Sequence, residues 1–424
     1  MDQRCSAAFV RWLSTSLQTG HHNRALSGKI YIAGVGLISA IGNNVAGTLL
    51  ALENHHSGIG AITKLETIHR GRLPVGEVKL DDEQLAQSSG LPAGVSRTAM
   101  LSMIAAREAY LDAGVSSLPG IRTGFVSANT VGGMDKTEQF FSPFLQARNS
   151  GRLRNVVHHE CGSVTELVAD RLGIKNLITT ISTACSSSAN SIFFGARLIR
   201  HNKLDVVIAG GTDALTKFTI NGFNTLQILD EQPCMPFDEN RRGLNLGEGA
   251  GYVVLVSEAV ARKLQKECYC ILSGYSNAND AHHQTASSPD GQGSYLAMKN
   301  ALAHAGLKPS DIDYINLHGT GTANNDISEG TAIQRLFDPH YPKMSSTKSF
   351  TGHTLGASGG IEAVFSALAI KHGVVYPNLR LSTKMAALPF VPEKSFLKDQ
   401  RVKNVLSNSF GFGGNCSSLI FSTA

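Results

Sequence analysis

The sequence predicts an α/β protein built from a duplicated module, on the strength of two strands and two strand-loop-helix units. A short apolar, β-branched run at 29–39 (KIYIAGVGLIS) has the composition of a buried strand. A second run that begins at 268 (CYCILSGYSNAND) has the same character. In each half of the chain an apolar strand also leads through a small-residue turn into a helix, at 177–199 and again at 313–337.

The length of the chain, 424 residues, exceeds what one simple core usually supports, so two large halves are expected. We place the boundary at residue 268, with an N-terminal half over 29–267 and a C-terminal half over 268–424. Residues 1–28 are expected to lie outside the fold, because they hold three arginines against a single acid and are rich in serine and threonine. Such a composition is typical of an organelle transit peptide, and a cloning leader is the alternative.

Amphipathic helices are expected between the strands. The segment 96–114 is an example, with a glycine at 114 that is placed to end the helix. One face of this helix would carry four apolar residues at helical spacing, namely Met100, Met103, Ile104 and Leu111.

Composition excludes several classes of function. No apolar run reaches the length of a membrane span, so no membrane association is expected. The net charge of +5 is small and the basic residues are scattered, which argues against nucleic-acid binding. The seven cysteines are odd in number and widely spaced, so neither a disulfide framework nor a metal site is expected. A cytoplasmic location fits these features, with a mitochondrion or plastid as the alternative if 1–28 is a transit peptide.

Cys185 is the candidate nucleophile. In STACSSSAN it follows an apolar strand and directly precedes an apolar-faced helix, which places its sulfur at a helix N-terminus. The unpaired N–H groups and the positive end of the helix dipole there favour thiolate, so a lowered thiol pKa is expected. On this segment alone, a buried structural cysteine in a tight turn remains the alternative.

Two glycine-flanked histidines in separate loops strengthen the case for a site. His318 lies in HGTGTANNDISEG, and His353 lies in SSTKSFTGHTLGASGGIEA. Four charged residues accompany them in these segments, namely Asp326, Glu329, Lys348 and Glu362. Two such histidines together with an activated cysteine are better explained as one catalytic site than as three unrelated structural groups.

The chain resembles the β-ketoacyl synthases of the thiolase superfamily, most closely the elongating type II condensing enzymes. The resemblance covers essentially all of 29–424. It rests on five motifs in their order: STACSSSAN, LGEGAGY at 246–252, HGTGT at 318–322, SSTKSFTGH at 345–353 and NSFGFGGN at 408–415. It implies a thiolase-like fold of two repeats layered αβαβα.

The resemblance also implies the catalytic roles. Cys185 would accept an acyl chain from acyl carrier protein as a thioester. His318 and His353 would stabilise the enolate that forms when malonyl-acyl-carrier protein loses carbon dioxide, since imidazole N–H groups stabilise charge where it develops. The main-chain N–H groups of Cys185 and Phe412 would form an oxyanion hole, with Phe412 also as a gate. The reaction is a decarboxylative Claisen condensation in fatty acid or polyketide synthesis that yields a 3-oxoacyl-acyl-carrier protein.

Supporting residues follow from the same resemblance. Lys348 would be the structural cation of the site, held by Asp326 and Glu329, and it would tune His318 electrostatically. Glu362 would be a buried acid behind the second histidine. The hydroxyls of two threonines, Thr320 and Thr322, would hold the phosphopantetheine arm. No cofactor is expected, because the substrates are carried on that arm.

Two departures from the family pattern stand out. Asn415 and Cys416 follow the GFGG glycines where many relatives have Thr-Asn, which puts the hydrogen bonding behind the Phe412 loop in question. The run RRGLNLGEGAG has Leu244 and Asn245 where an Asp-Gly-Phe type segment is more familiar, which is expected to alter the acyl pocket.

Other functions fit less well. A thiolase or a CoA-primed initiating synthase would need a second reactive cysteine, or an asparagine in place of one histidine. A chain-length partner subunit of a polyketide synthase keeps the fold without the nucleophile, so Cys185 argues against it. A nucleotide-binding protein would need GxGxxG after the first strand with an acid at the right distance. Acyl chain length and pathway stay open.

Two partners are expected. The resemblance implies a symmetric homodimer whose sheets pair edge to edge. Acyl carrier proteins are acidic, so a basic rim beside the tunnel is expected to dock them. The segment KLETIHRGRLP offers Lys64, Arg70 and Arg72 for that rim, and a merely solvated loop is the alternative.

Overall fold

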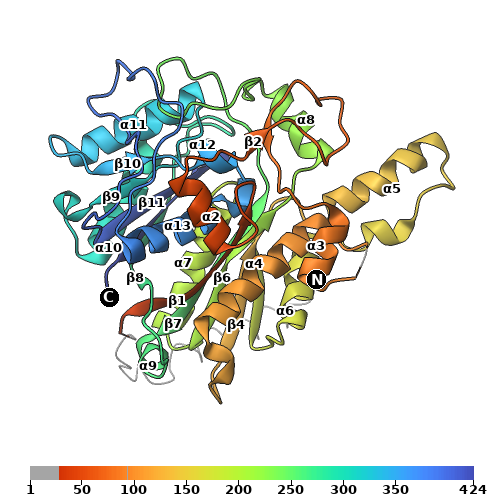
Figure 1. Ribbon diagram of the computed structural model, residues 1–424, viewed down its shortest axis with the longest axis horizontal. Helices are drawn as coiled ribbons and strands as arrows, with labels where there is room; N and C mark the ends of the chain where they lie inside the picture. The colour runs from red at the N-terminus through yellow and green to blue at the C-terminus, as the bar shows by residue number, and fades with distance from the viewer. Residues whose placement is uncertain (1–27, 93) are drawn as a thin grey trace, which may run out of the picture.

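A ten-stranded sheet forms the centre of the protein, as the computed structural model of residues 28–92 and 94–424 shows (Figure 1). Except for Gly28, the leader expected at 1–28 lies outside these described residues. The first half contributes β1 (Ile30–Ser39), β4 (Thr123–Ala128), β5 (Leu177–Ile181), β6 (Val206–Asp213) and β7 (Gly249–Ser257). The second half contributes β8 (Cys270–Asn279), β9 (Tyr314–Asn316), β10 (Lys343–Ser345), β11 (Asn404–Gly411) and β12 (Asn415–Ser422).

The two halves repeat one topology. Across the sheet the first half reads β5-β4-β6-β7-β1, and the second reads β10-β9-β11-β12-β8. In both, the first three strands of this order are parallel and the remaining pairings are antiparallel. β1 and β8 join the halves through only two residue pairs. The α/β fold class with a duplicated module is therefore confirmed.

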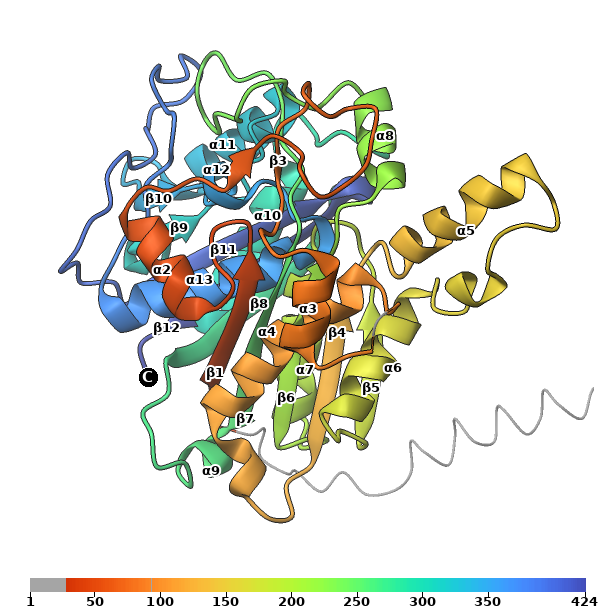
Figure 2. The same ribbon diagram turned by 45° about the vertical axis from the view of Figure 1, so that its right-hand side comes forward.

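Helices cover both faces of each half (Figures 1 and 2). α4 (Arg97–Ala113) and α6 (Cys161–Arg171) pack on the outer face of the first half. α10 (Gln292–Ala305) and α11 (Ala323–Phe337) do the same for the second. Between the halves lie α7 (Ser187–Arg200) and α13 (Ser358–His372). Among the described residues, no helix is long and apolar enough to cross a membrane.

The alternation of side chains along β6 shows why both faces of a strand are apolar. Val206 and Ile208 pack into the outer cluster with α4, whereas Val207 and Ala209 pack into the central cluster with α7 and α13. Successive side chains of a strand point to opposite faces, so a strand covered on both sides reads as a continuous apolar run.

α4 occupies the predicted segment, but its buried face differs from the predicted one. Ser96 caps its first turn, and Gly114 ends it with a left-handed backbone (φ 66). Met100 and Met103 are buried as expected, whereas Leu111 is 65% exposed. The helix instead turns its alanines toward β1, because that strand has glycines at the contact. A Cβ on Gly36 would lie 2.0 Å from the carbonyl oxygen of Ala105.

One helix stands apart from the layers. α5 (Met134–Gln146) projects from the body of the molecule in both views (Figures 1 and 2). Phe141 on α5 is 52% exposed and Leu145 is 68% exposed. Leu153 and Val157 in the segment that follows are also exposed. Four large apolar side chains are thus exposed on this projection and in the segment after it.

The packing of α13 on the sheet gives a stability prediction. A Cβ on Gly251 of β7 would lie 2.5 Å from the nitrogen of Ile361 and 2.6 Å from the carbonyl carbon of Gly360. Gly251→Ala must push α13 off the sheet, so we expect it to lower the free energy of unfolding by about 1–3 kcal/mol, measured by urea denaturation. Gly162→Ala on α6 is the control, since open space surrounds that position. Equal stability of the two variants would contradict this packing.

Candidate active site

Cys185 lies in the tight turn between β5 and α7. Ala184 before it has a left-handed backbone (φ 53), which a residue with a side chain adopts only where its surroundings hold it. The Oγ of Ser187 holds this turn, since it accepts from the nitrogen of Thr183 at 2.8 Å and donates to the oxygen of Ala184 at 2.5 Å. Cys185 is only 6% exposed. The sequence correctly placed it directly before the first turn of the helix.

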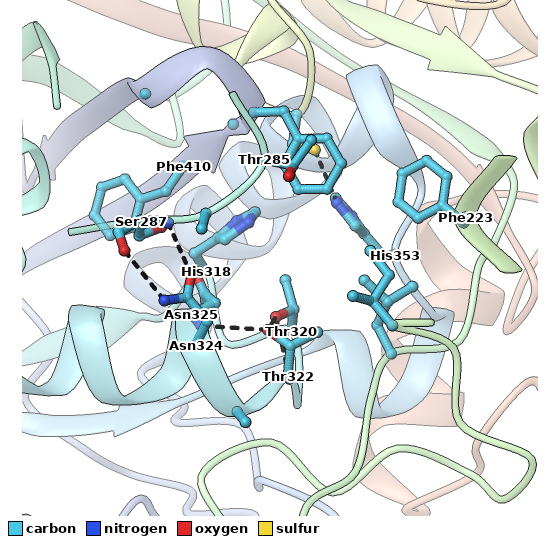
Figure 3. A pocket seen from close by; sticks show the side chains of 18 of the residues that line it. Phe223, Thr285, Ser287, His318, Thr320, Thr322, Asn324, Asn325, His353 and Phe410 are labelled. Carbon is cyan, nitrogen blue, oxygen red and sulfur yellow. Dashed lines mark hydrogen bonds between the residues drawn. The ribbon is translucent and has the colours of Figure 1, made fainter. Parts of the chain in front are cut away.

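His353 reaches the nucleophile from the second half of the chain. Its Nε2 lies 3.0 Å from the Sγ of Cys185, the contact drawn dashed in Figure 3. Its Nδ1 lies 3.0 Å from the Oγ of Ser358. The main-chain nitrogen of His353 donates to the oxygen of Asn245 at 2.7 Å, which fixes the loop. A hydroxyl can both donate and accept a hydrogen bond. When Ser358 accepts from Nδ1–H, Nε2 is free to accept a proton, and when Ser358 donates to Nδ1, Nε2 carries the proton of the neutral ring.

His318 lies beside His353, with the ring centroids 5.5 Å apart and the rings nearly perpendicular at 87°. The Nζ of Lys348 donates to the Nδ1 of His318 at 3.3 Å. An ammonium group has donors only, so Nδ1 must accept and the proton of the neutral ring sits on Nε2. His318 therefore presents a fixed N–H donor on the side of the ring away from Lys348.

The expectation that Asp326 and Glu329 hold Lys348 is wrong. The Nζ of Lys348 forms a buried ion pair with Glu362, and the two side chains are 2% and 3% exposed. Glu362 thus supports the first histidine through Lys348 rather than lying behind the second. A short turn after His353 folds the start of α13 back beside α12 (Lys348–Thr351), which brings the acid to the cation. Burial raises the pKa of Glu362 to about 7, and the charge of Lys348 opposes that rise.

Asp326 and Glu329 instead hold the main chain of the turn that carries His318. Glu329 accepts from the nitrogens of His318 at 2.9 Å and Gly319 at 2.8 Å. Asp326 accepts from the nitrogen of Gly321 at 3.2 Å. Burial raises the pKa of Glu329 to about 7. The two acids therefore position the histidine through its backbone.

The expected lowering of the Cys185 pKa is also wrong. Burial raises the pKa of this thiol to about 11, although the charge of Lys348 and the main-chain N–H groups of Phe412 and Cys185 act to lower it. Burial also lowers the pKa of His318 and His353 well below the usual value, and Lys348 adds to the effect. Both imidazoles are therefore neutral at pH 7. A neutral His353 can accept the thiol proton. Proton transfer to His353, rather than the helix N-terminus, is therefore the means by which the thiol of Cys185 is activated.

Two cavities meet at the sulfur of Cys185. The first, of about 340 Å³, holds both histidines and leads out past the start of α11; we call it the entrance cavity. Thr320 and Thr322 line it with their hydroxyls 2.9 Å apart, farther from the sulfur than the histidines are (Figure 3). The second, of about 400 Å³, is the apolar cavity. Its apolar lining includes Val131, Met134, Phe218, Leu226 and Leu355.

Phe412 and Phe223 border both cavities. Their rings stack with centroids 5.7 Å apart and planes at 17°. Sequence reasoning identified Phe412 but missed Phe223, which α8 (Lys217–Thr225) supplies. The hydrogen bonding that the first departure put in question is supplied by Asn415, whose Nδ2 donates to the oxygen of Phe412 at 3.4 Å. Cys416 is buried against Phe410 instead.

Asp213, at the end of β6, is a second residue that the sequence did not reveal. It is fully buried and accepts from the nitrogens of Thr130 at 2.8 Å, Val131 at 3.1 Å and Gly356 at 2.7 Å. These three residues belong to the loops that wall the apolar cavity. Burial raises the pKa of Asp213 to about 6. The only sequence signal was an acid that ends an apolar run.

The second departure from the family pattern lies beside both cavities, because Leu244 packs in the hydrophobic cluster that includes Val131 and Leu355 of the apolar cavity. Leu244 lines the entrance cavity. Asn245 is buried, and its Oδ1 accepts from the nitrogen of Cys234 at 2.6 Å while its Nδ2 donates to the oxygens of Asp230 and Gln232 at 3.1 Å. Asn245 therefore fixes the loop before it, whereas a change to the acyl pocket at Leu244 stays a prediction.

The residues offered for a basic rim lie in the loop between β2 (Ile59–Gly60) and β3 (Val75–Gly76). Arg70 donates to the oxygen of Leu65 at 2.9 Å, within its own loop. Arg72 donates to the Oδ1 of Asn224 on α8 at 2.9 Å, which brings this loop beside the helix that borders both cavities. Docking of a partner by Lys64, Arg70 and Arg72 stays a prediction.

Family models and curated relatives agree on one group of proteins. The model for the beta-ketoacyl synthase N-terminal domain matches residues 27–261, and that for the C-terminal domain matches 269–382. A 3-oxoacyl-acyl-carrier-protein synthase 2 of Coxiella burnetii is 33% identical over 93% of this chain and 98% of its own length. The protein of the same name from Staphylococcus aureus is 34% identical over the same shares.

The solved structures that are similar to this chain belong to the same group of proteins. The ishigamide ketosynthase/chain length factor matches with a TM-score of 0.88 at 28% identity, over 94% of this chain and 100% of that one. The ketosynthase ApeO in complex with its chain length factor ApeC, from Xenorhabdus doucetiae, has a TM-score of 0.79 at 30% identity, over 93% of this chain and 98% of that one. A beta-ketoacyl synthase of Burkholderia phymatum has a TM-score of 0.83 at 26% identity, over 93% of this chain and 99% of that one.

The influence of Lys348 on the thiol can be tested by chemical labelling. Because its charge lowers the pKa of Cys185, Lys348→Met should slow alkylation of Cys185 by iodoacetamide at pH 8 by about tenfold, the factor for one pKa unit. Mass spectrometry of the labelled peptides measures this rate, with Cys161 as the internal reference. Lys371→Met is the matched control, since that lysine pairs with Glu267 on the surface. An unchanged rate at Cys185 would contradict the coupling.

Proposed function

This chain belongs to the beta-ketoacyl synthase family, the condensing enzymes of fatty acid and polyketide synthesis, and we propose how its own residues divide the reaction. The enzyme joins an acyl group to malonyl-acyl-carrier protein and releases carbon dioxide. One observation carries the assignment of roles: the sulfur of Cys185 lies 3.0 Å from a neutral imidazole where two cavities meet. The reaction needs no cofactor in this proposal, because the phosphopantetheine arm of the carrier delivers both substrates.

Acyl transfer comes first. The thiol proton of Cys185 passes to the Nε2 of His353, and the thiolate attacks the thioester carbonyl of the acyl-carrier protein. The main-chain N–H groups of Cys185 and Phe412 both act to lower the pKa of the thiol, and in this proposal they stabilise the oxyanion that forms beside it. The carrier thiolate leaves and takes the proton from His353. The acyl chain remains on Cys185 and occupies the apolar cavity.

Decarboxylation and condensation follow in the entrance cavity. The thioester oxygen of the malonyl group accepts from the Nε2–H of His318 and from that of His353, now in the tautomer whose Nδ1 accepts from Ser358, which stabilises the enolate as carbon dioxide leaves. The enolate carbon attacks the acyl thioester on Cys185, and the new carbon–carbon bond forms as the sulfur departs. The thiolate takes up a proton from solvent. In this proposal Thr320 and Thr322, which line the same cavity, bind the pantetheine arm during this step.

Two sets of variants test the division of labour. Cys185→Ser should abolish both acyl transfer to the enzyme and condensation, because only the thiol forms the exchangeable thioester. His318→Ala should slow malonyl decarboxylation by about 100-fold, the scale for loss of an oxyanion donor, and His353→Ala should do the same. Acylation of Cys185 should suffer less in His318→Ala. Mass spectrometry of the acylated enzyme and release of labelled carbon dioxide measure the two steps.

The result that contradicts this mechanism is equally specific. If both histidine variants decarboxylated malonyl-acyl-carrier protein at the wild-type rate, the assignment of the enolate donors would be wrong. If Cys185→Ser kept near-normal elongation, the assignment of the nucleophile would be wrong.

A symmetric homodimer is part of the proposal. β5 is the edge strand of the first half, and Ile178 on it is 39% exposed. The wall of the apolar cavity is partly open, since Phe218 is 66% exposed and Leu226 is 43% exposed. A second copy that paired along β5 would cover this edge and complete the cavity. Two structural relatives, the ishigamide ketosynthase/chain length factor and ApeO in complex with its chain length factor ApeC, are a precedent for pairing of such chains.

The exposed face of α5 gives the test of this dimer. Phe141→Asp combined with Leu145→Asp should place two buried charges in the interface and leave a monomer of 45.1 kDa in light scattering, whereas the unchanged chain should show twice that mass. Leu111→Asp is the control, because this residue is 65% exposed on α4. A stable monomer of the unchanged chain at micromolar concentration would overturn the proposal.

Acyl carrier protein is the proposed macromolecular partner. An acidic carrier would dock on the basic residues Lys64, Arg70 and Arg72, with exposed charges that raise the rate of association. Arg72 contacts α8 beside the cavities, which supports this position. The expected cytoplasmic location stays a prediction, since residues 1–27, which would carry a targeting signal, lie outside the described residues.

A further inference from the structure

Arg242 lies in the segment that departs from the family pattern, and it faces the entrance cavity. The Arg242 side chain is 58% exposed, so it is in contact with solvent at the mouth. Asp230, whose side chain is 2% exposed, holds it. The Nη2 of Arg242 donates to the Oδ1 of Asp230 at 2.8 Å and its Nε donates to Oδ2 at 3.4 Å. A mobile surface arginine is thereby fixed in one orientation.

The neighbouring residues bring Arg242 to the start of α11. Arg241 donates through Nη2 to the oxygen of Ala323 at 3.0 Å and through Nε to the oxygen of Thr322 at 3.3 Å. The backbones also touch, since a Cβ on Gly321 would lie 2.9 Å from the oxygen of Gly243. The segment 241–243 and the loop before α11 therefore form one continuous wall of the mouth.

The basic side chain at this mouth is Arg242, which keeps N–H donors beyond its ion pair with Asp230. Among the described residues that line the entrance cavity, Arg242 is the only lysine or arginine, and the two histidines are neutral. The lining acid, Asp280, is satisfied by the nitrogens of Ser288 at 2.6 Å and Gly293 at 2.9 Å. The 15-residue helix α11 adds the positive end of its dipole at the same wall.

The donors of Arg242 match a phosphate group. A guanidinium group has five N–H donors in a planar fork. Asp230 uses the Nε–H and one Nη2–H, so three N–H groups remain for another acceptor. Phosphate oxygens fit this fork with two parallel hydrogen bonds.

We propose that Arg242 binds the phosphate of the phosphopantetheine arm and so holds the carrier's thioester in register with Cys185. This inference rests on the proposed function and deepens it, because it names the residue that recognises the charged end of the arm. The thioester end meets the histidines deep in the cavity, and the phosphate end meets the arginine at the mouth. The buried Asp230 keeps the guanidinium group in place between turnovers.

Three substrates that carry the same acyl group test this role: an acyl-pantetheine, an acyl-4′-phosphopantetheine and an acyl-acyl-carrier protein. Arg242→Ala should raise KM for the two phosphate-bearing substrates by about twofold to fivefold, the upper range for an exposed ion pair, with kcat unchanged. KM for the acyl-pantetheine should not change. Arg242→Lys should restore part of the loss, because it keeps the charge without the fork.

Arg122→Ala is the matched control. Arg122 is 47% exposed and pairs with Asp205 at 2.9 Å, so its environment is similar, but it precedes β4 at the end of the strand away from Cys185. This variant should leave KM for all three substrates at the wild-type value.

Four results would overturn the proposal. An equal rise of KM for acyl-pantetheine would mean that Arg242 shapes the cavity rather than binding phosphate. A rise for the carrier protein alone would mean that it contacts the protein surface of the carrier. No change of KM with any substrate would mean that Arg242 contacts neither the phosphate nor the protein surface of the carrier. A wild-type enzyme that consumed none of the three would overturn the proposed function, and the role of Arg242 with it.

Discussion

The contact between the sulfur of Cys185 and the imidazole of His353 joins the two halves of the chain, and the chemistry depends on it. A distance of 3.0 Å must be kept between residues that are 168 positions apart. β1 and β8 share only two residue pairs, so the sheet alone does not fix this distance. The two central helices, α7 and α13, fix this distance. The Oγ of Ser188 on α7 accepts from the nitrogen of Gly360 on α13 at 2.7 Å, directly between the two catalytic turns.

The electrostatics of the site follow from the same burial. Fully buried imidazoles and carboxyl groups lose hydration, so the pKa of each histidine falls and that of Glu362 rises to about 7. Lys348 is the one cation in this group, and its ion pair with Glu362 keeps it beside His318. Its charge favours the thiolate of Cys185 and disfavours protonation of both histidines. A protonated imidazole would have no lone pair for the thiol proton, and burial, with the charge of Lys348 adding to it, keeps His353 deprotonated.

The sequence predicted the reactive groups better than their partners. Cys185, His318 and His353 were expected in one site because two glycine-flanked histidines in separate loops and a cysteine at a helix N-terminus are better explained together than apart. The pairing of Lys348 with Glu362 depends on how a short turn folds α13 back, which spacing along the chain does not determine. The raised pKa of Cys185 was missed for a related reason. A helix terminus is visible in the sequence, whereas burial is a property of the assembled fold.

The position of the stacked rings of Phe412 and Phe223 imposes an order on the reaction. Both rings border the entrance cavity and the apolar cavity, and the two cavities meet at Cys185. An acyl chain that arrives through the entrance must pass these rings before it reaches the apolar cavity. Gly413 directly after Phe412 has a left-handed backbone (φ 76), which glycine adopts without strain, so this loop can change conformation at low cost. Once the chain lies beyond the rings, the entrance cavity is free for the malonyl thioester. One mouth therefore serves two substrates in turn, and the covalent link at Cys185 holds the first while the second binds.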